Sequence, residues 1–220
     1  MRKTLLLVAV LLLGSTALFA QRTTPYKYGH RWYFSVQGGP SFYDGDYTYV
    51  FRHEGRWAEP IVPDGAFSLG YNFTDAHELR FTAMYAKNRA NCVSIMEDLY
   101  PHTFKSASLF ADYVLSFNAL GEFYTEFNPK IYLGVGGAYT FEFSDPHHPT
   151  MVLTDPNLVP GFNFGTIMEY DFPSGLGLFA DLGFMFLIDP GDGQGWIYFP
   201  LDMDIALNFG IVYHFKRSKR

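Results

Sequence analysis

Residues 67–73 read Phe67-Ser68-Leu69-Gly70-Tyr71-Asn72-Phe73, and this short stretch decides the fold class. Its odd-numbered positions carry large apolar or aromatic side chains, whereas its even-numbered positions carry small or polar ones. Side chains of a β-strand point alternately to its two faces, so a period of two predicts a strand with one bulky face and one small, polar face.

The same alternation recurs in seven further segments, at residues 32–42, 79–85, 109–117, 131–143, 162–172, 176–186 and 203–215. Such segments suit a membrane barrel, because a tilted strand needs about 9–11 residues to cross a bilayer. Long connections are expected at 44–65, 88–105, 144–160 and 189–202, and short turns at 74–77 and 173–175. The link at 119–128 departs from this order, because it is not short. Long connections on one rim and short turns on the other predict an all-β, eight-stranded, antiparallel up-and-down transmembrane barrel.

The bulky face is expected to contact lipid rather than to fill the barrel, as it would in a soluble lipocalin. Roughly forty large side chains lie on this face, and an eight-stranded interior has room for far fewer. They include Trp32, Phe34, Phe67, Phe81, Tyr113, Phe162, Phe164, Leu182, Phe184, Ile205, Phe209 and Ile211. The opposite face is rich in Ser, Gly, Ala and Asn, which fit a narrow lumen.

Aromatic residues near the predicted strand ends have two open interpretations, interfacial girdles or plain lipid-facing bulk. They are Trp32, Tyr85, Tyr139, Phe141, Tyr170, Phe172 and Tyr213.

Composition narrows the function classes. Aromatic residues make up 19% of the chain and charged residues 17%, which is unlike a disordered chain. The net charge of −6 gives no basis for a nucleic-acid partner, which requires clustered Lys and Arg. A single cysteine, Cys92, has no partner for an internal disulfide and is expected to be inert.

The two ends of the chain predict how it is targeted. Arg2 and Lys3 precede an apolar run over residues 5–13, and small residues lead to Ala20, which is the anatomy of a secretory signal peptide. We therefore expect a signal peptide at 1–20, a periplasmic segment at 21–30, an outer-membrane barrel at 31–215 and a solvated basic tail at 216–220. The expected location is the outer membrane, reached by signal-dependent secretion.

The last strand carries a more specific pattern. Residues 208–215 read Asn208-Phe209-Gly210-Ile211-Val212-Tyr213-His214-Phe215, and Asn208, Gly210, Tyr213 and Phe215 resemble the β-signal recognised by the barrel-assembly machinery. Residues 31–215 as a whole resemble the small OmpA/OmpX-type barrels. That resemblance concerns the architecture and implies outer-membrane lipid and the assembly machinery as partners. It says little about the specific function, because one fold supports many functions.

A weaker resemblance is to the PorG-like barrels of type IX secretion. It is based on residues 38–46 (Gly-Gly-Pro-Ser-Phe-Tyr-Asp-Gly-Asp), 70–73 (Gly-Tyr-Asn-Phe) and 132–137 (Tyr-Leu-Gly-Val-Gly-Gly). An acidic Tyr-Leu-Asp segment associated with that group has no clear counterpart here.

Strand parity places a set of charged residues in the lumen. A layer at the periplasmic end is expected to contain Arg31, Glu78, Arg80, Lys130, Glu169, Asp171 and His214. Lys130 and Asp171 are close enough in the predicted topology to pair directly. Buried charges persist only when paired, so we interpret this layer as a salt-bridged plug. Asp112, Glu142, Asp181 and Asp204 are expected to lie higher in the lumen, without an inward basic partner.

No pattern in the chain indicates catalysis, a metal or a cofactor. His102 near Ser106 or Ser108 is a weak candidate for nucleophilic chemistry. Residues 147–148 are adjacent histidines, whose side chains diverge in extended chain, and residues 189–195 lack the spacing of a calcium loop. We expect no enzymatic activity.

The long connections are the best candidates for contacts with another envelope protein. They contain Arg52, Arg56, Trp57, Trp196 and Tyr198, which are residue types typical of interface anchors. The predicted function is structural or partner-binding. Three alternatives stay open: an accessory barrel of a secretion or transport machine, a narrow channel for small apolar molecules, and a lipid-modifying enzyme.

Overall fold

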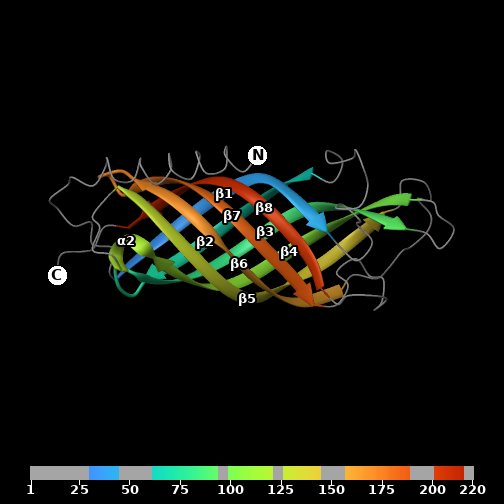
Figure 1. The fold of residues 1–220 in the computed structure, drawn as a ribbon, viewed down its shortest axis with the longest axis horizontal. Coiled ribbons are helices and arrows are strands. Elements are labelled where there is room, and N and C mark those ends of the chain that lie inside the picture. The colour runs from blue at the N-terminus through green and yellow to red at the C-terminus, as the bar shows by residue number, and fades with distance from the viewer. Residues whose placement is uncertain are drawn as a thin grey trace, which may run out of the picture.

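A computed structural model describes residues 30–44, 61–93, 99–120, 126–144, 157–188 and 201–215. Each strand pairs antiparallel with its neighbours in the chain, and the first pairs with the last to close a barrel (Figure 1). The strands are β1 (Arg31–Asp44), β2 (Ile61–Asn72), β3 (His77–Val93), β4 (Leu99–Ser116), β5 (Phe127–Ser144), β6 (Asn157–Asp171), β7 (Leu176–Ile188) and β8 (Leu201–His214). The predicted eight-stranded up-and-down barrel is confirmed.

Several strands are longer than the ranges predicted from the alternation of large and small side chains. β3 and β4 stay paired as far as Val93 and Leu99, so most of the expected connection at 88–105 is strand. Past Tyr85 the alternation of large apolar and small side chains stops, but the hydrogen-bonded pairing of β3 with β4 continues. Asn88 Nδ2 donates to Ser106 Oγ at 2.9 Å in this part of the pair. The expected connections at 44–65, 144–160 and 189–202 are likewise shortened by the early starts of β2, β6 and β8.

The link between β4 and β5 contains a short helix, α2 (Phe117–Leu120), so Phe117 ends outside the strand in which we expected it. Nowhere in the described ranges is a helix long and apolar enough to cross a membrane.

Two short turns close one end of the barrel, which we call the turn end; the opposite end is the loop end. In the first turn, Thr74 Oγ1 accepts hydrogen bonds from the backbone N–H groups of Ala76 at 3.2 Å and His77 at 3.1 Å. In the second, Gly175 has a φ of 90°, a conformation that glycine adopts without steric cost. Both turns lie at the end where α2 is found, and β3, β4 and β5 extend beyond the wall at the loop end (Figure 1).

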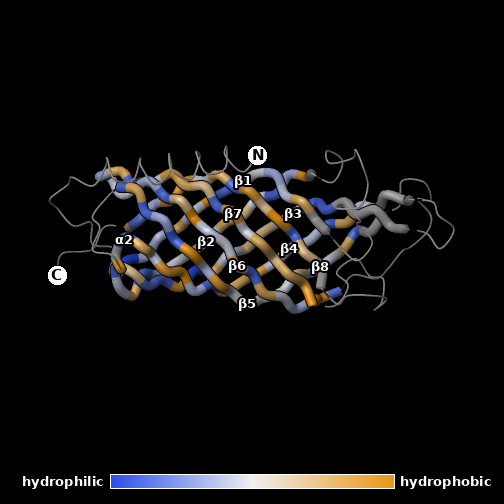
Figure 2. Tube along the Cα trace, viewed as in Figure 1, coloured by the Kyte–Doolittle hydropathy of each residue, from blue (hydrophilic) through white to orange (hydrophobic). Residues whose placement is uncertain are grey.

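The bulky face of every strand points away from the lumen. Large apolar side chains on the outer surface include Leu133 at 62% exposed and Phe209 at 60% exposed. Apolar and polar positions alternate along each strand of the tube (Figure 2), and the lumen side carries the buried polar residues. An apolar outer band around a polar interior is the arrangement of a barrel that contacts hydrocarbon.

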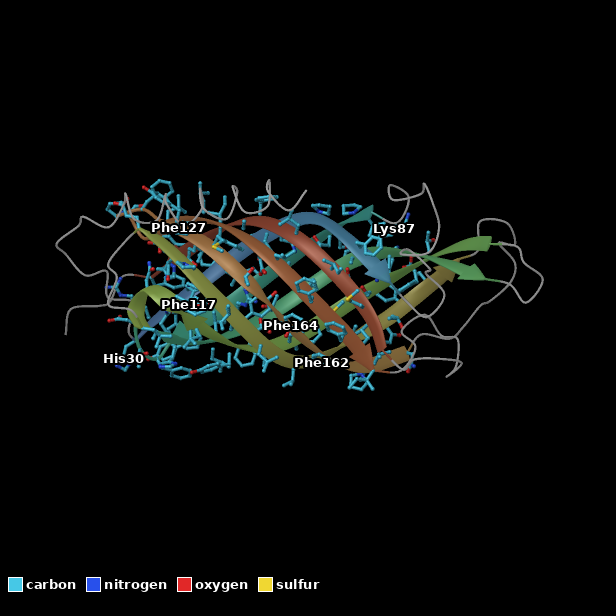
Figure 3. All side chains as sticks on the ribbon, viewed as in Figure 1. His30, Lys87, Phe117, Phe127, Phe162 and Phe164 are labelled. Carbon is cyan, nitrogen blue, oxygen red and sulfur yellow. The ribbon has the colours of Figure 1, made fainter. Side chains whose placement is uncertain are left out.

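Aromatic rings gather on the outer surface at the turn end. Trp32 lies 5.0 Å from Tyr71, and Phe34 lies 5.9 Å from Tyr213, measured between ring centroids. At the other end, Tyr139 stacks on Phe141 at 5.6 Å. These contacts favour girdles over isolated lipid-facing rings. In Figure 3, His30 and Phe117 mark the turn end and Lys87 the loop end.

The lumen also contains large rings, although the alternation of bulk predicts large rings only on the outer face. Each of four inward rings lies directly opposite a glycine on the next strand: Tyr33 opposite Gly70, Phe110 opposite Gly136, Tyr132 opposite Gly165, and Phe179 opposite Gly210. A Cβ built on Gly165 would lie 2.5 Å from Tyr132 Oη, and one on Gly210 would lie 2.5 Å from Phe179 Cζ. The glycines therefore leave the space that these rings fill.

Replacing Gly70 with alanine is expected to destabilise the barrel by about 1–3 kcal/mol, the usual cost of overpacking. Its Cβ would collide with the Tyr33 ring, which is 4% exposed and has little room to move. Gly65→Ala is the matched control on the same strand, because its Cβ would meet Gln37 O at an ordinary 3.7 Å. Urea unfolding from lipid vesicles measures both; equal stability of the two variants would contradict the ring-on-glycine packing.

Candidate functional site

The seven charged residues predicted for the layer at the periplasmic end all lie on strands, at inward positions. Glu78, Arg80, Lys130, Glu169, Asp171 and His214 are buried, and Arg31 is half-buried at the start of β1. They do not form one layer. The ion pairs divide them into a floor near the turn end and a middle tier above it.

Lys130 organises the floor. Its Nζ lies 2.9 Å from Glu169 Oε2 and 3.1 Å from Glu78 Oε1, which joins β5 to β6 and β3. His214 Nε2 lies 2.8 Å from Glu169 Oε1 and 3.6 Å from Asp171 Oδ1, which adds β8. Glu78 also accepts a hydrogen bond from Asn72 Nδ2 at 3.3 Å. The floor is therefore a continuous chain of charged contacts across the lumen.

Local sequence explains how β6 reaches β8. Glu169 and Asp171 are two residues apart on a strand, so both point inward. Between them and β8 stands Gly177 of β7, where a Cβ would lie 2.9 Å from Asp171 Oδ1 and 2.8 Å from Val212 Cγ1. A side chain there would occupy the space through which the Asp171 carboxylate approaches His214.

Glu169, Asp171 and His214 also place three metal-ligand atoms within 4.8 Å of one another. This set was not predicted as a metal site from the sequence. Lys130 already supplies positive charge to Glu169 at 2.9 Å, so a metal ion would compete with a buried ammonium group. The contacts present are those of an ion-paired cluster.

The middle tier is centred on Arg80, so the prediction that Arg80 shares one layer with Glu78, Lys130 and His214 is wrong. Arg80 Nε donates to Asp112 Oδ2 at 2.8 Å, and its Nη1 donates to Asp181 Oδ2 at 3.3 Å. The guanidinium carbon lies 4.2 Å from the centroid of the Tyr132 ring, and Tyr132 Oη donates to Asp181 Oδ1 at 3.0 Å. The expectation that Asp112 and Asp181 lack a basic partner is therefore wrong.

The prediction that Glu142 points into the lumen is also wrong. Glu142 is exposed, has a φ of 55°, and forms an ion pair with Lys105 on the outside of the β4–β5 ladder. The register shifts beside it, between Thr103 and Lys105, and this β-bulge turns Glu142 to the outer face.

The β8 residues assigned to the assembly signal have definite structural places. Asn208 is buried and donates from Nδ2 to Asp64 Oδ2 at 3.2 Å, and Gly210 leaves space for Phe179. Tyr213 and Phe215 lie on the outer face, each with its ring within 6 Å of Phe34. Recognition by the assembly machinery stays a prediction.

Other candidates lie outside the described residues. They are the partner-contact residues Arg52, Arg56, Trp57, Trp196 and Tyr198, the segments 1–20 and 21–29, the tail 216–220, and the adjacent histidines at 147–148. The side chains of Cys92 and His102 also lie outside the described set.

Comparison with solved structures agrees with this geometry. A major outer membrane protein from Thermus thermophilus superposes with a TM-score of 0.50, covering 84% of this chain and 100% of its own, at 16% identity. This chain has the fold of a small outer-membrane β-barrel. The predicted resemblance to OmpA/OmpX-type barrels is thereby confirmed as a fold; the PorG-like resemblance stays a prediction.

Two further barrels show similar coverage. Neisserial surface protein A gives a TM-score of 0.49 at 14% identity, covering 84% of this chain and 97% of its own. OprG from Pseudomonas aeruginosa gives 0.49 at 12% identity, covering 86% and 99%. No protein-family model and no curated protein matches the sequence.

Proposed function

We propose that the protein is an integral barrel of the outer membrane, delivered by its signal peptide, whose lumen is closed and whose role is structural or partner-binding, without enzymatic activity. The observation that supports this most directly is the two-tier set of ion pairs across the lumen. If the interior of the barrel is obstructed, the surfaces that can contact other molecules are the outer wall and the loop end.

The ion pairs join strands that are not neighbours in the sheet. Arg80 on β3 bonds to Asp181 on β7, and His214 on β8 bonds to Glu169 on β6. Side chains that bridge across the interior block the path a solute would take. This argues against the alternative of a narrow channel for small apolar molecules.

The loop end offers the surface for a partner. β3, β4 and β5 have 17, 18 and 18 residues, whereas the other strands have 12 to 15. Their paired ends project from the wall (Figure 1) and carry charged groups such as Lys87 and the Lys105–Glu142 pair. A projecting, hydrogen-bonded platform holds contact residues in place at low entropic cost.

Planar-bilayer recording tests the closed lumen. We expect purified, folded protein to insert without a stable ionic conductance, because two tiers of ion pairs cross the lumen. An open porin recorded in the same bilayers controls for insertion conditions. A large, stable conductance from the barrel would refute this part of the proposal.

Cross-linking and pull-down from native outer membranes test the role. A stoichiometric envelope protein that is lost when the projecting ends of β3 and β4 are shortened would support partner binding. A barrel that brings down no partner would favour a purely structural role. Recovery of secretion-machine components would favour the accessory-barrel alternative, and a change in lipid A mass would favour the enzyme.

A further inference from the structure

The outer face of the barrel is almost free of charged side chains. Among the strand residues whose side chains the structure describes, the only Lys, Arg, Asp or Glu residues on that face are Lys87, Lys105 and Glu142. Lys87 stands at the loop end (Figure 3), and the other two lie on the neighbouring strands β4 and β5. The charge on the outer wall is therefore gathered at one place, rather than scattered around the barrel.

The two lysines form a cross-strand pair. Lys87 is directly opposite Lys105 in the β3–β4 ladder, and the Cβ atoms of such a pair are about 4.5–5.5 Å apart, a spacing at which like charges repel. Glu142 forms an ion pair with Lys105. Within the described ranges, no acidic group forms an ion pair with Lys87. One positive charge is therefore left over, and an anion between the two ammonium groups would relieve their repulsion.

Aromatic rings indicate the height of these lysines in the membrane. Tyr85, two residues before Lys87 and on the same face of β3, is 49% exposed. Lys105 is opposite Phe141 on β5, and the ring of Phe141 stacks on that of Tyr139. Exposed aromatic residues near strand ends lie at the interface between hydrocarbon and headgroups. The lysines beside them are therefore at the level of the lipid headgroups.

The backbone holds the pair at the rim of the wall. The ladder between β2 and β3 begins at Asp64 and Ala86, so Lys87 is the first residue of β3 beyond that ladder. From there β3 and β4 stay paired as far as Val93 and Leu99. The lysines thus stand on a hydrogen-bonded pair of strands and not on a connection, which lowers the entropic cost of binding a ligand.

We propose that Lys87 and Lys105 bind the phosphate group of a lipid headgroup in the leaflet at the loop end, and that Glu142 limits the positive charge of the site. Lysine binds phosphate as a point charge, and lysines close to an anionic membrane surface are attracted to it. Side chains on a strand stand roughly perpendicular to the sheet, so both lysines face sideways into the lipid. This direction favours a lipid over a protein docked on the loop end. The inference rests on the proposed function, because only a barrel that lies in a membrane has headgroups at this level.

Native mass spectrometry of the folded barrel in detergent tests the proposal, with phosphatidic acid as the probe. We expect one phosphatidic acid to bind in preference to phosphatidylcholine of the same chain length. Lys87→Gln should weaken this binding about fivefold, the effect of one lysine at an anionic surface. Lys87→Arg should bind like the wild type, and Glu142→Gln should bind more tightly, because it removes the carboxylate paired with Lys105.

Ser174→Asp is the matched control. Like Lys87→Gln it lowers the net charge by one, but in the exposed turn at the opposite end of the barrel. Aspartate also keeps an acceptor for the backbone N–H of Leu176, which donates to Ser174 Oγ at 3.3 Å. We expect this variant to bind phosphatidic acid as the wild type does.

Several results would overturn the proposal. They are equal affinity for the two lipids, unchanged affinity in Lys87→Gln, an equal loss in Ser174→Asp, and displacement of the lipid by equimolar inorganic phosphate, which would indicate a site for the free ion. Loss of a protein partner in Lys87→Gln, with lipid binding intact, would assign the pair to protein docking instead. Insertion of the wild type into phosphatidylcholine vesicles is checked first. A barrel that inserts without preferring phosphatidic acid refutes this inference alone, whereas one that does not insert refutes the proposed function as well.

Discussion

Replacing Arg80 with methionine is expected to lower the free energy of unfolding by about 3–5 kcal/mol, the range found when one partner of a buried ion pair is removed. Arg80 is 3% exposed, and its two carboxylate partners are as deeply buried, Asp112 at 0% and Asp181 at 3%. Without the guanidinium, both carboxylates would stay in the lumen with no basic group bonded to them. Thr82 and Tyr132 would still donate one hydrogen bond to each, which is too little to balance the charge.

Two further variants separate charge from packing. Arg80→Lys keeps the positive charge but has no planar fork to reach both carboxylates and to stack on Tyr132, so its loss should be intermediate. The triple variant Arg80→Met, Asp112→Asn, Asp181→Asn removes the whole charged group and should recover most of the stability. Urea unfolding from lipid vesicles, followed by tryptophan fluorescence, gives the three values. A triple variant no more stable than Arg80→Met would show that packing dominates.

The fold could be predicted because two periodic signals agree. The alternation in residues 67–73 fixes which side chains share a face, and the order of long and short connections fixes which strands are neighbours. Volume then decides the direction of the bulky face, since side chains such as Phe164 and Phe209 are too large for a narrow lumen. None of these signals depends on accurate strand ends. The predicted fold was therefore confirmed although β3 extends to Val93 and β4 begins at Leu99, beyond the predicted ranges.

The arrangement inside the lumen was harder to predict, because parity gives the face of a residue and not its height. Strands in a barrel are tilted, so residues counted equally far from two strand ends lie at different levels. Glu78 and Arg80 are only two residues apart, yet the first belongs to the floor and the second to the middle tier. Because Arg80 lies higher in the lumen than Glu78, it reaches Asp112 and Asp181 and forms ion pairs with both.

Two other departures have local causes. A single bulge beside Lys105 turns Glu142 outward, and no sequence pattern marks its position. The inward rings carry a signal that was available, since Tyr33 and Tyr132 occupy positions of the small-residue face. Each faces a glycine on the next strand, but that pairing is visible only when the register is known.

Phe164→Arg is the variant that tests the contact with lipid. Phe164 stands in the middle of β6 on the outer face (Figure 3), 41% exposed and with its ring 5.1 Å from that of Phe184. An arginine facing hydrocarbon near the midplane is expected to cost about 2–4 kcal/mol. In a water-soluble barrel, the same substitution at an exposed position would change stability by about 0.5 kcal/mol or less.

One control changes the depth of the substituted residue in the membrane, and the other changes the chemical type of the new side chain. Tyr170→Arg lies on the same strand and face but at the turn end, where an arginine reaches the interface and should cost roughly 0–1 kcal/mol. Phe164→Leu removes the stacked ring while keeping an apolar side chain, so it isolates the packing loss. Unfolding from lipid vesicles in urea measures all three. If Phe164→Arg and Tyr170→Arg were equally stable, the cost would not depend on depth, and the outer band would not be what hydrocarbon touches.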